Sequence, residues 1–210
     1  MVRVRFRRRR WCLGALCASL LALPSVVPAT IEEQRARLPP PATCEDPVTG
    51  VWRSHRYNPR FGDWMIFTLT VRRAATDPAS LVGSIEAHSW SGGPTQSEPP
   101  PCGPGVLHWT VEMTALGRFD APRRQIEFWG TRWWVRERQC RGWPSYNLDH
   151  FTGTIDPRIQ EFQSVNNDGG RSVNEPTVFR RVRCLEDLGA PHPAVTPPPF
   201  RPPPRRGGCS

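Results

Sequence analysis

Residues 106–115 alternate strictly between apolar and polar side chains, and this period of two limits what the chain can form. The apolar positions are Leu107, Trp109, Val111, Met113 and Ala115, and the polar positions between them are His108, Thr110, Glu112 and Thr114. A helix would place apolar residues three and four apart, whereas successive side chains of a strand point to opposite faces. The segment is therefore predicted to be a β-strand with one buried face.

Similar alternation recurs along the chain, for example in residues 63–73, where Met65, Phe67, Leu69 and Val71 share one face. Turns such as Asp77-Pro78 and Asp156-Pro157 separate the alternating segments. Eight strands are predicted: 50–57, 63–73, 80–90, 105–115, 124–138 (bent at Gly130), 147–155, 160–166 and 176–184. Sequential antiparallel strands with short connections favour an all-β, up-and-down barrel over a β-sandwich, and no helix is expected in the mature domain.

The N-terminus has the order of an export signal. Six arginines within residues 3–10 precede an apolar stretch, Trp11 to Leu23, and a site that ends at the small residue Ala29. The apolar stretch, about 13 residues, is shorter than the roughly 20 that cross a bilayer as a helix. Residues 1–29 are therefore predicted to be a cleaved signal peptide, with a retained anchor as the alternative. The protein is expected to be secreted or to reside in the periplasm or cell envelope.

Removing this signal changes the charge of the chain. The full sequence has 28 arginines, no lysine and 19 acidic residues, for a net charge of +9. Without residues 1–29, 22 arginines and a net charge of +3 remain. Most of the excess that would suggest nucleic-acid binding therefore lies in the signal, and nucleic acid is not an expected partner. The absence of lysine excludes Schiff-base chemistry and a P-loop.

Proline-rich segments flank the predicted single β domain of residues 44–184. Residues 30–43 contain three successive prolines and are predicted to be an extended leader. Residues 185–210 contain eight prolines and are predicted to form a polyproline II or disordered tail. This tail is interpreted as a loose C-terminus, with a spacer or a ligand for a proline-recognising partner as the alternative. Cys209 near its end is a candidate for an intermolecular disulfide.

Gly50-Val51-Trp52 opens the first predicted strand, and the last strand carries Arg180, Arg181 and Arg183. Together these features resemble the calycin barrels, the group of lipocalins and avidins. In that family the tryptophan of a G-x-W turn closes one end of the barrel and an arginine of the last strand lies across it. The resemblance implies Trp52 and Arg180 as this structural pair, a cation–π contact of roughly 0.5–2 kcal/mol. It also implies, by analogy, binding of a small ligand.

The mature chain has five cysteines, and export makes disulfides between four of them the expectation. If the barrel closes as the resemblance implies, the first and last strands are neighbours and Cys44–Cys184 is the natural pair. Cys102–Cys140 would then tie the loop 91–104 to the segment after residue 138. The sequence alone leaves all three pairings open. No C-x-x-C spacing is present, so a zinc cluster is not expected.

Histidines and carboxylates on the predicted strands are the candidates for chemistry. Glu86 and His88 share a face, and His108 and Glu112 lie on the next strand, so the four could ligate a metal or act as acid and base. All four lie on the polar side of their strands, which favours a solvated surface.

Two further chemical readings are weaker. A glycosidase-like carboxylate pair stays open, because Asp63, Glu86, Glu112, Glu127 and Glu137 all lie on strands. The run from Asn166 to Gly170 fits a tight turn better than a calcium loop. No catalytic residue, metal or cofactor is assigned.

Tryptophan is the most unusual feature, since eight remain after the signal. Trp129, Trp133 and Trp134 crowd one strand with Arg132 and Arg136, and Trp64 lies opposite the apolar face of its own strand. A strand with indoles on both faces needs cover on the second face, from a ligand, a partner or the loop 91–104. Extra tryptophan in a small core is the alternative.

These observations predict a non-enzymatic exported protein that acts as a binding or structural component of the cell envelope or extracellular material. Its expected contact surface for a protein or glycan comprises Trp129, Trp133, Trp134, Arg132, Arg136 and Trp64. A lipocalin-like carrier of a small apolar ligand, which requires a cavity, is the first alternative. A metal-dependent or glycosidase-like secreted enzyme is the second.

Expression of the full chain with its own N-terminus is expected to release a protein that begins at Thr30, because the small-residue site ends at Ala29. The intact mass of the exported protein measures this directly. A mass that includes residues 1–29 would support the retained anchor instead.

Overall fold

The structure is a computed structural model that describes residues 30–140, 145–165 and 175–186. Its elements are α1 (Ile31–Arg37), β1 (Gly50–Arg53), β2 (Arg56–Asn58), β3 (Asp63–Arg73), β4 (Ser80–Ser91), β5 (His108–Asp120), β6 (Gln125–Arg138), β7 (His150–Thr154), β8 (Glu161–Val165) and β9 (Pro176–Arg183). The expected signal peptide, the turn at Asn166–Gly170, Trp143 and the proline-rich tail with Cys209 lie outside the described residues.

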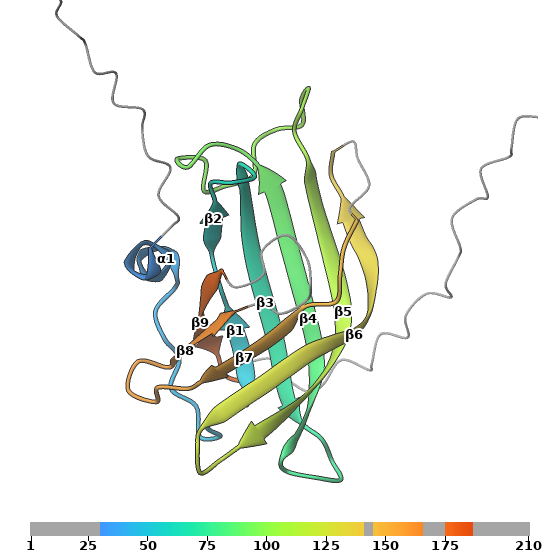
Figure 1. The fold of residues 1–210 in the computed structure, drawn as a ribbon. Coiled ribbons are helices and arrows are strands. Elements are labelled where there is room, and N and C mark those ends of the chain that lie inside the picture. Colours follow the sequence, from blue (N-terminus) through green and yellow to red (C-terminus); the bar gives the residue numbers. More distant parts are fainter. Residues whose placement is uncertain (1–29, 141–144, 166–174, 187–210) are drawn as a thin grey trace, which may run out of the picture.

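The strands form one antiparallel sheet in the order β7-β6-β5-β4-β3-β1-β9-β8, with β2 paired to the start of β3. The two end strands, β7 and β8, meet where the Thr152 amide donates to Ser164 Oγ at 2.8 Å. Figure 1 shows this sheet curling into a nearly closed barrel. The predicted up-and-down barrel is confirmed, and the two disulfides are Cys44–Cys184 and Cys102–Cys140, the pairs that barrel closure implies.

Alternate side chains point into the barrel, as the period of two predicts, and aromatic rings fill its middle. The ring of Phe67 lies 4.9 Å from that of Phe151, which in turn lies 4.8 Å from Phe179. Phe128 is fully buried in the same cluster. The expected strand 105–115 begins only at His108, so Leu107 lies outside it and is 51% exposed.

Trp52 closes one end of the barrel. Its indole is fully buried and donates to the Val48 carbonyl at 2.9 Å, while the guanidinium of Arg181 lies 5.2 Å from the ring centroid. Gly50 adopts φ +134°, and a Cβ there would approach the Arg183 carbonyl to 2.7 Å. The glycine of the G-x-W turn is therefore required by both backbone conformation and strand approach.

Arg181, rather than Arg180, is the arginine on Trp52, so the predicted partner was wrong by one residue. Val178 shares a face of β9 with Arg180, and this face is the outer one, because the Val178 amide donates to Gln34 Oε1 of α1 at 3.0 Å and the Val178 side chain is buried there. Arg180 shares that outer side and forms an ion pair with Glu161 at 2.6 Å.

The helix α1 contradicts the expectation that residues 30–43 form an extended leader. Thr30 and Glu33 form a reciprocal capping box at its start. Gln34, fully buried, donates to the Pro176 carbonyl at 3.0 Å in addition to accepting from Val178, so tertiary hydrogen bonds hold this seven-residue helix against β9. No helix in the described ranges is long and apolar enough to cross a membrane.

Replacing Arg181 by alanine is expected to lower the free energy of unfolding by about 3 kcal/mol, because the carbonyls of Asp46 and Thr49 and the amide oxygen of Gln160 would lose a buried charged donor. Arg183→Ala, an exposed position on the same strand, should change it by less than about 0.5 kcal/mol. Urea unfolding followed by tryptophan fluorescence measures both. Equal effects would contradict the role of Arg181 at the closed end.

Asp46 organises the turn that leads into β1. Its carboxylate accepts from the Val48 and Thr49 amides at 2.9 Å each and from Arg73 Nε at 2.7 Å. Burial alone would raise the pKa of Asp46, but these hydrogen bonds and the charge of Arg73 outweigh it and lower the pKa. A carboxylate with a lowered folded pKa contributes stability above its unfolded pKa of about 3.9, which is lost as pH falls through the folded pKa.

Asp46→Asn is therefore expected to be less stable than the wild type at pH 7, by about 1 kcal/mol, and to match it more closely below about pH 3. Urea unfolding across this pH range measures the difference. A constant difference at all pH values would mean that ionised Asp46 does not stabilise the turn.

Candidate functional site

A bulge in β6 decides which side chains of this strand face outward. Ala115 of β5 pairs with Gly130 and Thr114 pairs with Arg132, so Thr131 is an extra residue. Gly130 suits this position because a Cβ there would meet Met113 Sδ at 2.7 Å. The extra residue reverses the alternation of side chains from Arg132 to Val135, and a second register shift follows at Arg136.

As a result, one surface on the outside of β6 gathers Trp129, Arg132, Trp134 and Arg136, which we call the Trp/Arg face. Trp129 pairs in register with Leu116, whose side chain is 45% exposed, and its ring lies 6.0 Å from that of His150. Both indoles keep part of their surface exposed, and both arginines are exposed. Four of the six predicted contact residues therefore share one surface.

The other two predicted contact residues do not belong to this surface. Trp133 pairs with Met113 on the inner side, where it packs against the core and lies 6.3 Å from Tyr146. Trp64 is fully buried. Its assignment to an exposed contact surface was wrong because the chain covers it with its own segments.

Trp64 and Trp90 form a second, smaller hydrophobic cluster with Ile66 on the outside of β3 and β4. The loop between β4 and β5, residues 92–107, lies over this cluster, and its carbonyl groups accept hydrogen bonds from both indoles. Trp64 Nε1 donates to the Gly93 carbonyl at 2.9 Å, and Trp90 Nε1 donates to the Gln96 carbonyl at 3.0 Å. The outer indoles were expected to be covered by a ligand, a partner or this loop. For Trp64 and Trp90 the loop provides the cover.

Carboxylates flank the Trp/Arg face on neighbouring strands. Glu86 of β4 and Glu112 of β5 are directly opposite each other, and Glu112 is also paired with Trp134. Arg136 forms ion pairs with both carboxylates. Burial raises the pKa of Glu112, and the nearby charge of Glu86 acts in the same direction, whereas Arg136 opposes it. These groups supply donors and acceptors beside an exposed indole.

The histidines are less solvated than the sequence predicts. His55 is only 8% exposed and hydrogen-bonds to the Ser97 carbonyl through Nε2 at 3.2 Å. His88 and His108 are partly buried, and their Nε2 atoms lie 2.7 Å apart. His150 lies 3.0 Å from Glu127. The predicted juxtaposition of His88 and His108 is therefore real, but it lies on the outer wall of the barrel.

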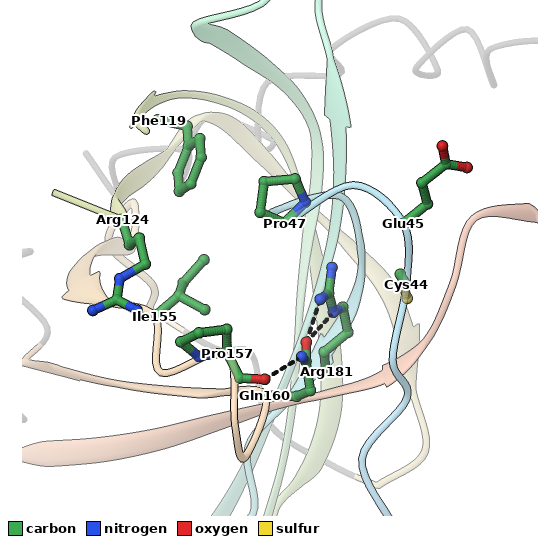
Figure 2. Close-up of a pocket in the computed structure, with 9 residues that line it drawn as sticks. All are labelled: Cys44, Glu45, Pro47, Phe119, Arg124, Ile155, Pro157, Gln160 and Arg181. Carbon is green, nitrogen blue, oxygen red and sulfur yellow. Dashed lines mark hydrogen bonds between the residues drawn. The ribbon is translucent and has the colours of Figure 1, made fainter. Parts of the chain in front are cut away.

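A pocket of about 210 Å³ lies at the closed end of the barrel, beside the Cys44–Cys184 disulfide (Figure 2). Pro47, Phe119 and Ile155 give it an apolar lining. In Figure 2 the guanidinium of Arg181 is directed at Gln160, and Glu45 and Arg124 point their charged groups away from the centre. Since its polar groups are engaged in holding the closed end, this small pocket is part of the barrel's structural plug.

The opposite, open end of the barrel carries partly buried aromatic residues on its inner side. Trp109 and Trp133 both pack near Tyr146, at ring distances of 5.3 and 6.3 Å. Arg56, 5% exposed, lies 2.9 Å from a carboxylate oxygen of Glu175. Buried aromatic rings, among them Phe67, Phe128 and Phe151, occupy the middle of the barrel below this end.

Sequence reasoning missed Leu116 and His150, which adjoin Trp129. Their place beside Trp129 depends on strand register, which no local pattern reveals. It also missed the bulge at Thr131, although Gly130, a glycine within a strand, was a signal for it. Within residues 30–140, 145–165 and 175–186, no three His, Cys, Asp or Glu side chains are grouped as metal ligands.

Comparisons with known proteins give no further assignment. No family model, no curated protein and no solved structure matches the chain. The barrel and its closed end are compatible with a calycin-like fold on their own geometry.

Proposed function

We propose that this protein is an exported, non-enzymatic binding protein whose Trp/Arg face holds a glycan of the cell envelope or extracellular material. The observation that carries the proposal is the contrast between two pairs of outer indoles. Trp64 and Trp90 are at most 1% exposed beneath the chain's own loop, whereas Trp129 and Trp134 keep exposed surface. Exposed indoles beside polar groups are typical of surfaces that bind a partner.

The chemistry of the Trp/Arg face favours a glycan over a hydrophobic protein surface. The apolar face of a sugar ring can stack on an indole while its hydroxyls hydrogen-bond to charged side chains. Arg136 and Glu112 provide such groups next to Trp134, and Glu127 and His150 provide them next to Trp129. The two indoles are separated by about four strand steps, or about 14 Å. A linear glycan of several sugar rings would therefore contact both.

The disulfide bonds of the domain also agree with export and a binding role. Two disulfides suit an oxidising compartment such as the periplasm or the extracellular space. The carrier alternative is less well supported, because aromatic residues occupy the middle of the barrel. The enzyme alternative would need a concave site around the carboxylates, and Glu86 and Glu112 lie on the outer wall.

The double variant Trp129→Ala/Trp134→Ala is expected to lose glycan binding by at least about fivefold per indole while remaining folded, since stacking contributes about 1 kcal/mol or more per ring. Cosedimentation with purified peptidoglycan and binding to an oligosaccharide array measure this. Phe61→Ala, which removes an exposed aromatic at the turn between β2 and β3, should bind like the wild type.

Circular dichroism and urea unfolding of the same variants separate binding from folding. Unfolding of the double variant would show that these indoles belong to the core and would end the proposal. A wild-type protein that binds no tested glycan, or a double variant that binds as well as Phe61→Ala, would overturn the glycan assignment.

A further inference from the structure

His88 and His108 form a close pair of histidines that the Trp/Arg face does not use. They lie where β4 ends and β5 begins, at the upper end of the barrel in Figure 1. His108 pairs with Trp90 and His88 pairs with Thr110, so the two histidines are diagonal neighbours on the outer wall. Their rings are nearly parallel, at 28°, with centroids 5.0 Å apart.

The approach of the two Nε2 atoms to 2.7 Å restricts what can lie between them. A neutral imidazole has one N–H group and one nitrogen lone pair, whereas a protonated ring has two N–H groups and no lone pair. At this distance the two nitrogens share a proton, with the N–H group of one ring donating to the lone pair of the other.

The distance is close to that required by a shared metal ion. Zn²⁺ binds imidazole nitrogen at about 2.0–2.1 Å, so two nitrogens of a tetrahedral site lie about 3.3 Å apart. Small rotations of the two side chains, opening the gap by about 0.6 Å, would admit the ion. Backbone pairing between β4 and β5 fixes the positions from which both rings approach, so little ordering is needed on binding.

The surroundings of the pair also suit a divalent cation. Glu86 lies two residues before His88 on the same face, and Glu137 pairs with Thr110 on the other side of β5. Glu137 adds negative charge near both imidazoles, whereas Arg53 adds positive charge near His88. Trp90, 1% exposed, packs against His88 at 5.1 Å and shields one side of the pair from solvent.

We propose that His88 and His108 form a two-imidazole binding site for a divalent transition-metal ion, Zn²⁺ or Cu²⁺, on the outer wall of the barrel. Imidazole is a preferred ligand of both ions. The described residues contain no group of three or more metal-ligating side chains, so water completes the coordination. The site is therefore exchangeable, in contrast to a closed four-ligand structural zinc site.

The test uses the full-length exported protein without a polyhistidine tag, stripped of metal by a chelator. Cys209 is replaced by serine in every sample, because a thiol would bind these metals on its own. Isothermal titration with Zn²⁺ and with Cu²⁺ gives stoichiometry and affinity. Electron paramagnetic resonance of the Cu²⁺ sample reports the nitrogen ligands. Cu²⁺ at this site should also quench the fluorescence of Trp90, which lies against His88.

One equivalent of metal is expected in the parent protein, with at least about tenfold weaker binding in His88→Asn and in His108→Asn, since each removes one of two protein ligands. The matched control is His150→Asn, an outer-wall histidine that lies beside Glu127 and should leave the affinity unchanged. Because one substitution alone could disturb the fold, two single variants are compared. The electron paramagnetic resonance of Cu²⁺ on the unmutated pair is recorded as well.

If the parent protein binds neither ion, the two histidines share only a proton and the metal site is refuted. Unchanged affinity in the double variant His88→Asn/His108→Asn would place the metal elsewhere and refute it equally. Neither result bears on the Trp/Arg face, whose glycan binding is measured independently.

Discussion

The contact between Arg181 and Trp52 joins the first and last strands of the barrel, and the remaining architecture depends on this closure. The guanidinium lies over the indole while it also donates to the carbonyls of Asp46 and Thr49, just before β1. It thereby satisfies backbone acceptors at the point where β1 meets β9. The Cys44–Cys184 disulfide links the same two regions covalently. With the first and last strands of the barrel joined there, β3 to β7 follow β1 in sequential order around the sheet.

The alternation of apolar residues was sufficient to predict the barrel, because each long strand has one face in a single core. The alternation gave wrong predictions where a segment distant in the sequence buries the outer face of a strand. Val178 and Arg180 share one face of β9, and the apolar side chain is typical of an inner face, but α1 buries Val178 from outside, so the arginine on Trp52 is Arg181. Likewise, Trp64 seemed to be a contact residue because its own strand has another apolar face. Only the path of the loop 92–107 shows that it is covered.

The Trp/Arg face illustrates a different limit. Strict alternation would place Trp129 and Trp133 on one side of β6 and Trp134 on the other. The extra residue Thr131 instead brings Trp129 and Trp134 together and leaves Trp133 inside. A single bulge thus determines which indoles are exposed, and its position depends on the pairing of β6 with β5. The strand and its bend at Gly130 were predicted from the sequence. Which side chains beyond Gly130 face outward depends on how β6 pairs with β5.

Strand β5 carries elements of both proposed sites along one outer face. His108 lies at its start, Glu112 in its middle and Leu116 near Trp129 toward its other end. His108 and Leu116 are eight residues apart, or about 27 Å along the strand. This is about three times the screening length in physiological salt, roughly 8 Å, so charge on a bound metal would scarcely be felt at Trp129. Between them, Arg136 is held by Glu86 and Glu112, which fixes its guanidinium beside Trp134. The two proposed sites therefore lie toward opposite ends of this outer face, with the ion pairs of Arg136 between them.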